Sequence, residues 1–341
     1  MMKNKLNSKA SMLTLLLLGL FWFCKKKQEL HPSDKAALAE LAKYSSYESE
    51  GGRIVKISIR NRDLTEIPVQ VFRFAKLRVL DLQGNKITEP NAKLFELIPA
   101  LEELSLQDNL LEKIPEEIKN LKNLHKLNLR KNKINEVPLV LGSLPLQSLD
   151  ISDNKLTAFA EALLNLNDLQ RLWLQSNEIA DLPAQIAQLE SLLYLNVSHN
   201  KLTGLPEELW TIKSLENLLF YQNQIQGEIS ENLKNLQNLQ VLNISDNKIT
   251  KVLSYAILLP NLRILNVHDN EINETLPENI KDLRYLKNLV LHNNPAITGV
   301  LPLQLLELPD LVEIKIANTG IDKANLAPFT QKEGLETDIQ L

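Results

Sequence analysis

Two histidines in similar surroundings are the first candidates for chemistry in this sequence. His268 lies in the phrase LRILNVHDN and His292 in LKNLVLHNN, so each is the seventh residue of its phrase. If the two phrases form adjacent parallel strands, the imidazoles lie about 4.8 Å apart. Together with Asp269, or with Asp246 from the preceding phrase, they form a candidate site for a divalent metal. The alternative is a pair of surface histidines in a column of solvated side chains, because the sequence defines no third ligand.

A second group of residues is typical of a binding surface. Three consecutive phrases read LQRLWLQSN, LLYLNVSHN and LENLLFYQN, and strand alternation leaves their third, fifth and seventh positions outside the core. These positions carry a cationic residue and several aromatic and apolar ones, namely Arg171, Trp173, Tyr194, Leu219 and Tyr221. Such side chains are enriched at interface hot spots. We interpret the five as one contact patch, and the alternative is that the tryptophan merely shields its neighbouring strands.

The rest of the chain offers little for catalysis or for binding nucleic acid. It has 38 basic and 42 acidic residues, and this balance argues against a phosphate-rich partner, which needs a basic face. The sequence contains no phosphate-cradling glycine loop, no serine nucleophile elbow and only one cysteine. We therefore expect no enzymatic activity, no cofactor and no nucleic-acid partner.

Both groups of candidates belong to a repeat that fills most of the chain. Its template is L-x-x-L-x-L-x-x-N-x-L, and successive copies begin 22 to 25 residues apart. The copies start at Ile54, Leu77, Leu101, Leu124, Leu146, Leu169, Leu192, Leu215, Leu239, Leu262, Leu286 and Leu311. The ninth position is asparagine in ten consecutive copies, at Asn85, Asn109, Asn132, Asn154, Asn177, Asn200, Asn223, Asn247, Asn270 and Asn294.

The template predicts one short strand and one turn per copy. The L-x-L alternation buries one face of the strand. The asparagine side chain can bond neighbouring backbone groups as the chain leaves the strand, so stacked copies should form an asparagine ladder. In several copies a proline, such as Pro115, then opens a helical segment of one or two turns. No copy can bury its leucines alone, and the copies are therefore expected to stack into an α/β solenoid.

This pattern resembles the leucine-rich repeat family over about four-fifths of the chain. The resemblance implies a leucine-rich-repeat horseshoe, with a parallel sheet on the concave side and short helices and turns on the convex side. Later copies, such as INETLPENI, are closer to the plant-like variant of the family. By analogy with bacterial adhesins and internalin-like proteins, the concave face is expected to recognise a protein partner.

The N-terminal end of the solenoid is expected to carry a cap. Residues 32–53 form this cap, and 54–321 contain the twelve repeats. The cap includes PSDKAALAELAKYSSY, which predicts an amphipathic helix over Pro32–Tyr47 with Ser33 as its N-cap. Arg62 replaces the asparagine in the first copy, and terminal units are expected to be atypical.

The C-terminal end is expected to be capped as well. Thr319 stands where the last copy should have asparagine. Residues 322–341 lack the template and are assigned to a C-terminal cap or tail, in which Leu326 and Phe329 close the last unit.

The first residues of the chain are typical of a secretion signal. Lysines precede the apolar run Met12–Phe23, which is shorter than the roughly 20 residues that span a bilayer. The run ends at Cys24, as in bacterial lipoproteins, although Phe23 is larger than the small residue usual before that cysteine. Spirochaetes are among the groups with looser versions of this motif. The resemblance implies a signal peptide over 1–23 and a lipidated tether over 24–31, and the alternative is an uncleaved signal anchor.

These expectations combine into one function. The chain is predicted to be a non-enzymatic protein-binding module at the bacterial envelope, anchored by its lipid in the outer membrane or at the cell surface. Its partner would be a host surface or matrix protein. The alternatives are an envelope scaffold that binds a partner of the same cell, and a periplasmic-facing or secreted location.

Overall fold

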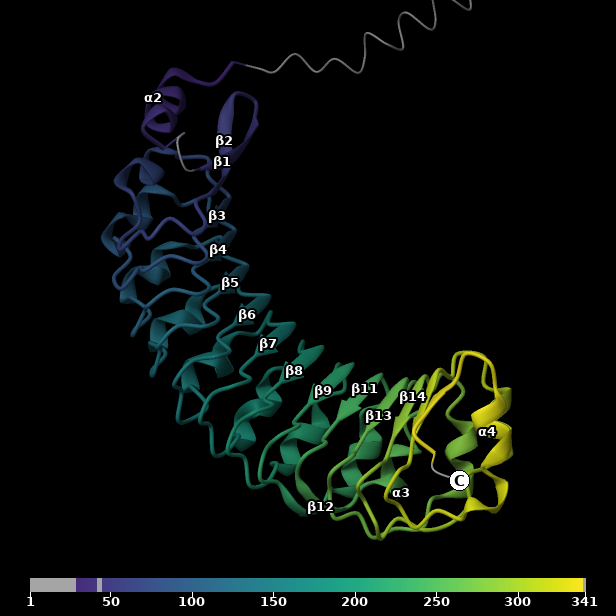
Figure 1. Ribbon diagram of the computed structural model, residues 1–341. Coiled ribbons are helices and arrows are strands. Elements are labelled where there is room, and N and C mark those ends of the chain that lie inside the picture. Colours follow the sequence, from purple (N-terminus) through teal and green to yellow (C-terminus); the bar gives the residue numbers. More distant parts are fainter. Residues whose placement is uncertain (1–28, 42–44, 340–341) are drawn as a thin grey trace, which may run out of the picture.

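The computed structural model describes residues 29–41 and 45–339. They form a curved arc in which the strands lie along the inner edge and the short helices along the outer edge (Figure 1). The arc follows the chain from its purple N-terminal part to its yellow C-terminal part. The predicted α/β solenoid with a concave parallel sheet is therefore confirmed.

Fourteen strands of the described chain form one sheet, in the order β1-β2-β3-β4-β5-β6-β7-β8-β9-β11-β13-β14-β15-β16. The first pair is antiparallel and the others are parallel. The strands of this sheet are β1 (Ser46–Glu50), β2 (Arg53–Ser58), β3 (Val79–Asp81), β4 (Glu103–Ser105), β5 (Lys126–Asn128), β6 (Ser148–Asp150), β7 (Arg171–Trp173), β8 (Tyr194–Asn196), β9 (Asn217–Leu219), β11 (Val241–Asn243), β13 (Ile264–Asn266), β14 (Asn288–Val290), β15 (Glu313–Lys315) and β16 (Glu336–Thr337). A separate pair, β10 (Gln226–Glu228) and β12 (Lys248–Lys251), is also parallel.

Short helices connect the strands along the convex side. The α-helices are α2 (Pro32–Leu41), α3 (Leu253–Ala256) and α4 (Ala327–Gln331). The 3-10 helices are η1 (Val69–Arg73), η2 (Ala92–Leu97), η3 (Glu116–Asn120), η4 (Leu139–Ser143), η5 (Glu161–Asn165), η6 (Ala184–Gln188), η7 (Glu207–Thr211), η8 (Glu231–Asn235), η9 (Glu278–Asp282), η10 (Leu303–Glu307) and η11 (Lys323–Asn325). Pro115 is the N-cap of η3, with φ of −69°, which confirms the predicted role of proline in opening these segments.

The apolar template residues form one continuous core between the sheet and the helices. In the copy that contains β7, Leu169, Leu172, Leu174 and Ile179 are all fully buried. Each such side chain stabilises the fold by roughly 1.5–3 kcal/mol relative to an exposed one. This burial leaves only alternate residues of each strand available on the concave face.

The predicted asparagine ladder is confirmed. Asn177 illustrates it: the side-chain Nδ2 donates to the carbonyls of Leu174 in its own copy and Ile151 in the preceding one. Its Oδ1 accepts the backbone N–H of Leu156, also in the preceding copy. Each rung therefore satisfies backbone groups of two units at once. The ladder ends at Thr319, whose hydroxyl donates to Ile316 O at 2.7 Å.

A second regularity lies at the eighth template position, directly before the ladder. In every copy this residue has a positive φ, between 52° and 72°. The residues are Asn61, Gly84, Asp108, Lys131, Asp153, Ser176, His199, Gln222, Asp246, Asp269, Asn293 and Asn318. Left-handed backbone favours glycine, asparagine, aspartate and histidine, so lysine, serine and glutamine here carry a conformational cost. This turn directs the chain away from the concave face.

The N-terminal cap differs from its prediction. Helix α2 ends at Leu41, and β1 then forms an antiparallel hairpin with β2 through Gly51 and Gly52, both with positive φ. The predicted helix was therefore too long, and Ser33 lies inside α2 rather than at its N-cap. Asp34 is fully buried and its carboxylate accepts the N–H of Ile54, which joins the helix to the first strand of the repeats.

The C-terminal segment extends the solenoid by one more strand. Strand β16 pairs with β15 in parallel register, although its residues do not match the template. Asp338 follows it and accepts the N–H groups of Ile316 and Ala317. Leu326 and Phe329 are buried in the core, as predicted.

The predicted signal peptide over 1–23 and the lipid attachment at Cys24 lie outside the described residues. Within the described part of the chain, no helix has the length and apolar character needed to cross a bilayer.

Candidate functional site

The concave face carries the two predicted groups of residues on different strands. The centre of the contact patch is Trp173, the last residue of β7, and Tyr194, the first residue of β8. Their ring centroids lie 5.0 Å apart and the planes are tilted by 38°. Both side chains are half-buried. The structure thus brings the two aromatic residues into direct contact while leaving part of each ring open to solvent.

Tyr221 extends the patch on the next unit. Its ring packs edge-on against His199, with centroids 5.0 Å apart and an interplanar angle of 80°.

Burial raises the pKa of the Tyr194 hydroxyl, while hydrogen bonds with Asn196 and Trp173 oppose this effect. The neutral phenol is therefore a polar group within a largely apolar surface, able to orient a partner that covers it.

Leu219 and Arg171 lie at the margins of the patch. Leu219 pairs in register with Asn196 of β8, and its side chain is half-buried. Arg171 is exposed and pairs in register with Tyr194. The structure places all five predicted residues on the neighbouring strands β7, β8 and β9, or, for Tyr221, just after β9.

A hollow of about 490 Å³ adjoins the patch on its N-terminal side. Arg171 and Trp173 line it together with Glu103, His125 and Lys126. Lys126 forms an ion pair with Glu103 at 3.5 Å, between exposed side chains. The contact surface therefore changes from aromatic to charged within a few strands, which suits a partner that has both apolar and polar groups.

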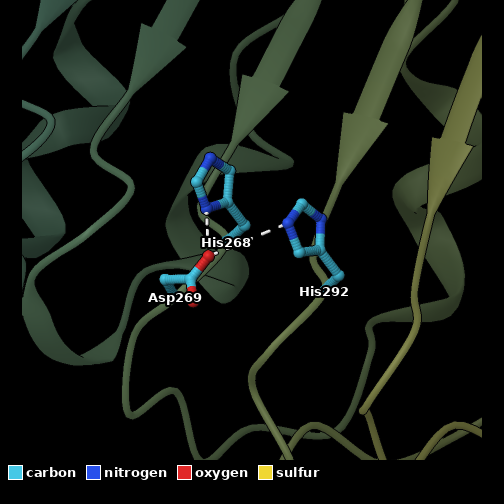
Figure 2. Close-up of side chains that lie close together, drawn as sticks. All are labelled: His268, Asp269 and His292. Atoms are coloured by element: carbon cyan, nitrogen blue, oxygen red, sulfur yellow. Dashed lines mark hydrogen bonds and ion pairs between the residues drawn. The ribbon is translucent and has the colours of Figure 1, made fainter.

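The histidine cluster lies farther along the same face. His268 follows β13 and His292 follows β14, and their rings are stacked, with centroids 4.5 Å apart and planes within 10°. Figure 2 shows both rings facing the carboxylate of Asp269. His268 Nδ1 lies 2.6 Å and His292 Nε2 3.8 Å from the same oxygen, Oδ2. The structure thus provides a third potential ligand for the predicted pair, and it is Asp269.

Asp246, the other predicted ligand, lies farther away. Its Oδ2 is 3.9 Å from His268 Nδ1. On the opposite side, Asp338 Oδ2 lies 4.0 Å from His292 Nδ1. The two imidazoles are therefore surrounded by three carboxylates from three different units.

Electrostatics favour an ionised Asp269 carboxylate and a neutral His292 imidazole. Burial tends to raise the pKa of Asp269, but hydrogen bonds with Asn293 and His268 and the nearby imidazoles outweigh it and keep this pKa low. Burial and the neighbouring His268 lower the pKa of His292. An anionic oxygen and neutral ring nitrogens are the forms in which these residues bind metals.

Two contributors to these sites were not among the predicted residues. His199 belongs to the aromatic cluster because the left-handed turn at the eighth position brings it against Tyr221. Asp338 reaches the histidine cluster because β16 adds a strand after the last template copy. The repeat periodicity could have identified His199, because it occupies a template position. Asp338 lies outside the template, so the periodicity could not identify it.

Comparison with protein families assigns the fold. A leucine-rich repeat region matches residues 140–259, a leucine rich repeat model matches 53–111, a model of two repeat copies matches 99–140, and a single-repeat model matches 261–283. The chain belongs to the leucine-rich repeat family. All four models describe repeats of a protein-interaction scaffold, and none of them is an enzyme family. No curated protein matches the sequence of this leucine-rich repeat chain.

Solved structures of other leucine-rich repeat proteins have the same architecture. One from Leptospira interrogans is 26% identical, covers 83% of this chain and 83% of its own, and has a TM-score of 0.60. The internalin InlF of Listeria monocytogenes is 21% identical, covers 93% and 100%, and has a TM-score of 0.66, which shows a shared fold. The Arabidopsis receptor kinase HAESA, solved with the peptide hormone IDA and the co-receptor SERK1, is 27% identical, covers 75% and 48%, and has a TM-score of 0.60.

Proposed function

We propose that this leucine-rich repeat protein binds a protein partner through its concave face, with Arg171, Trp173, Tyr194, Leu219 and Tyr221 as the contact patch. The observation that carries the proposal is the half-buried Trp173–Tyr194 pair on a face whose other outward residues are mostly polar. Aromatic residues held rigidly on adjacent strands offer contact area at little conformational cost. The peptide complex of HAESA supports the proposal, because a similar solenoid there binds a peptide.

The aromatic pair serves binding rather than folding in this proposal. Leu172, between Arg171 and Trp173, is fully buried and belongs to the core, whereas its two neighbours face away from it. The fifth template position, which Trp173 occupies, is serine, asparagine or aspartate in the five preceding copies. The scaffold therefore has no need of a tryptophan at this position.

A comparison of variants in direct binding tests this role. A partner identified by cross-linking to the full chain is titrated against wild type, Trp173→Ala and Tyr221→Ala. Each substitution should weaken binding by about 1–3 kcal/mol and lower the thermal midpoint by no more than a few degrees, since the lost ring contact contributes only about 0.5–1.5 kcal/mol to stability. Tyr285→Ala is the matched control, since Tyr285 is a tyrosine outside the patch and 48% exposed. Equal affinity of all four proteins would refute the patch, and so would a fall in thermal stability that accounts for the loss of binding.

We place the protein at the bacterial envelope, tethered by a lipid on Cys24, with the solenoid at the outer membrane or cell surface. Cys24 after the apolar run Met12–Phe23 is the basis for this location. Labelled palmitate should be incorporated by wild type and lost in Cys24→Ala. Incorporation by both proteins, or by neither, would contradict the lipid anchor.

An envelope scaffold with a partner from the same cell is the second candidate. The same N-terminal segment, the apolar run Met12–Phe23 followed by Cys24, supports this candidate too. A lipid anchor at Cys24 is compatible with a solenoid that faces either the outside or the inside of the envelope. Protease added to intact cells distinguishes the two: digestion supports a surface-exposed binder of host surface or matrix proteins, and protection supports the internal scaffold.

A further inference from the structure

The geometry points to a binding site for a divalent transition-metal ion formed by His268, Asp269 and His292. The site lies just after β13 and β14, beyond the contact patch, and it stands independently of the proposed function. Two imidazoles and one carboxylate are a ligand set that suits zinc and its first-row neighbours.

The ligand atoms already lie close to the arrangement that a metal requires. They are all within 4.8 Å of one another. Ligands of a tetrahedral zinc ion, about 2.0–2.1 Å from the metal, are roughly 3.3 Å apart. The His268–Asp269 contact of 2.6 Å must widen and the His292–Asp269 contact of 3.8 Å must close slightly. Both changes are below about an ångström, within the reach of side-chain rotation.

The backbone holds the three ligands firmly. His268 and His292 each lie two residues after the end of a hydrogen-bonded strand, so their backbone spacing is close to that of the sheet. Asp269 has a φ of 52° and its N–H donates to His292 O at 3.1 Å, which ties its turn to the next unit. Asn293 Nδ2 donates to Asp269 Oδ1 at 2.8 Å and leaves Oδ2 directed at the histidines. A metal would therefore meet a preorganised set of ligands.

Asp338 is the orienting group for His292. His292 Nδ1 is buried and has no hydrogen-bond partner among the described residues, and the nearest carboxylate oxygen is Asp338 Oδ2 at 4.0 Å. A proton on Nδ1 would be stabilised by that carboxylate, leaving the lone pair of Nε2 for the metal. Carboxylates that hydrogen-bond to the outer ring nitrogen commonly fix the tautomer of zinc-binding histidines, and Asp338 would have to move about 1 Å closer to His292 to form such a bond.

The fourth coordination position remains open to the concave side. The side chains of His268 and His292 are 21% and 23% exposed, and that of Asp269 is 40% exposed. Sites with three protein ligands and an exposed fourth position hold water or an external ligand. Calcium is disfavoured because it prefers six to eight oxygen ligands.

Zinc titration of the full chain tests the site. The parent protein carries Cys24→Ser and no polyhistidine tag, so that the cysteine thiol and added histidines do not compete, and it is kept in mild detergent. Isothermal titration calorimetry with Zn²⁺ alone should show one site. His268→Ser, His292→Ala and Asp269→Asn should each weaken binding about ten-fold or more, and Asp338→Asn about ten-fold. His125→Ala should bind as the parent does.

The three ligand substitutions have natural counterparts in other copies of the repeat. Ser245, Ala317 and Asn293 occupy the corresponding positions of other copies, so the variants should fold, and circular dichroism with thermal unfolding checks this. Visible absorption of bound Co²⁺ in the parent, lost in the ligand variants, gives a second readout. The site is refuted if the parent binds no zinc, if the folded ligand variants bind as tightly as the parent, or if His125→Ala causes the same loss.

Discussion

The ring centroids of Trp173 and Tyr194 lie 5.0 Å apart on adjacent strands, with the rings tilted by 38°. Aromatic pairs in this geometry interact by about 0.5–1.5 kcal/mol beyond the area that they bury. A double-mutant cycle with Trp173→Ala, Tyr194→Ala and the double variant should yield a coupling energy of this size in urea unfolding. Additive effects would show that the two rings are neighbours without mutual stabilisation.

Removal of one ladder rung should be costly. Asn177→Ala deletes two donated hydrogen bonds and one accepted bond, and leaves buried backbone groups of two units without partners. The expected loss is about 2–4 kcal/mol in the free energy of unfolding, since each unsatisfied buried group costs roughly 1–3 kcal/mol. Chemical denaturation measures it, and Asn167→Ala outside the ladder serves as the control. A loss below about 1 kcal/mol would mean that the ladder does not stabilise the solenoid as described.

The left-handed position offers a stabilising substitution. Gln222 is exposed and has a φ of 53°, which asparagine adopts more readily than glutamine. Asn293 and Asn318 already occupy the same position in later copies. Gln222→Asn should raise the free energy of unfolding by up to about 1 kcal/mol. An equal or lower denaturation midpoint would show that glutamine makes compensating contacts there.

Asp150 should make the stability of the protein depend on pH. Burial raises the pKa of this carboxyl, even though hydrogen bonds from Ser152 and the charge of Arg130 oppose the shift. The folded state therefore favours the protonated form, and stability is lost as pH rises from the usual aspartate value of 3.8 through the folded pKa. Asp150→Asn removes this penalty.

The variant should accordingly be more stable than wild type at neutral pH, by a few degrees at most in its thermal midpoint. The hydrogen-bond geometry is retained, because Asn243 accepts from Ser245 at the corresponding positions of a later copy. The difference between the two proteins should vanish below the usual aspartate pKa. If the stability difference between the two proteins persists unchanged in acid, it results from packing and not from ionisation.

Much of the fold follows from periodicity, because each template position has one environment in every copy. Leu172 and Asn177 could be assigned to the core and to the ladder from their place in the repeat alone. Trp173 and Tyr194 occupy outward template positions, so they could be placed on the outward side of adjacent strands in the same way. The structure adds their direct contact, which depends on rotamers that sequence spacing does not determine.

The unpredicted features lie where local chemistry competes with the pattern. Lys131 and Ser176 gave no sign of left-handed backbone, since neither residue type favours it, and the stacked turn overrides that preference. Ser46 and Tyr47 belong to β1, where they pair with Ser58 and Ile57 of β2, and not to the predicted helix. Asp338 approaches His292 through a strand whose residues lack the leucines of the template.

The constant spacing of the sheet sets a scale for what can bind to this protein. Trp173 is on β7 and His268 follows β13, and four strand steps separate them in the order β7-β8-β9-β11-β13. At about 4.8 Å per step, the aromatic patch and the histidine cluster lie roughly 19 Å apart along the sheet. A small ligand can occupy only one of them. A folded protein with an ordinary interface of about 800 Å² per partner is large enough to span both. One bound partner would then contact the aromatic rings and the metal ligands together.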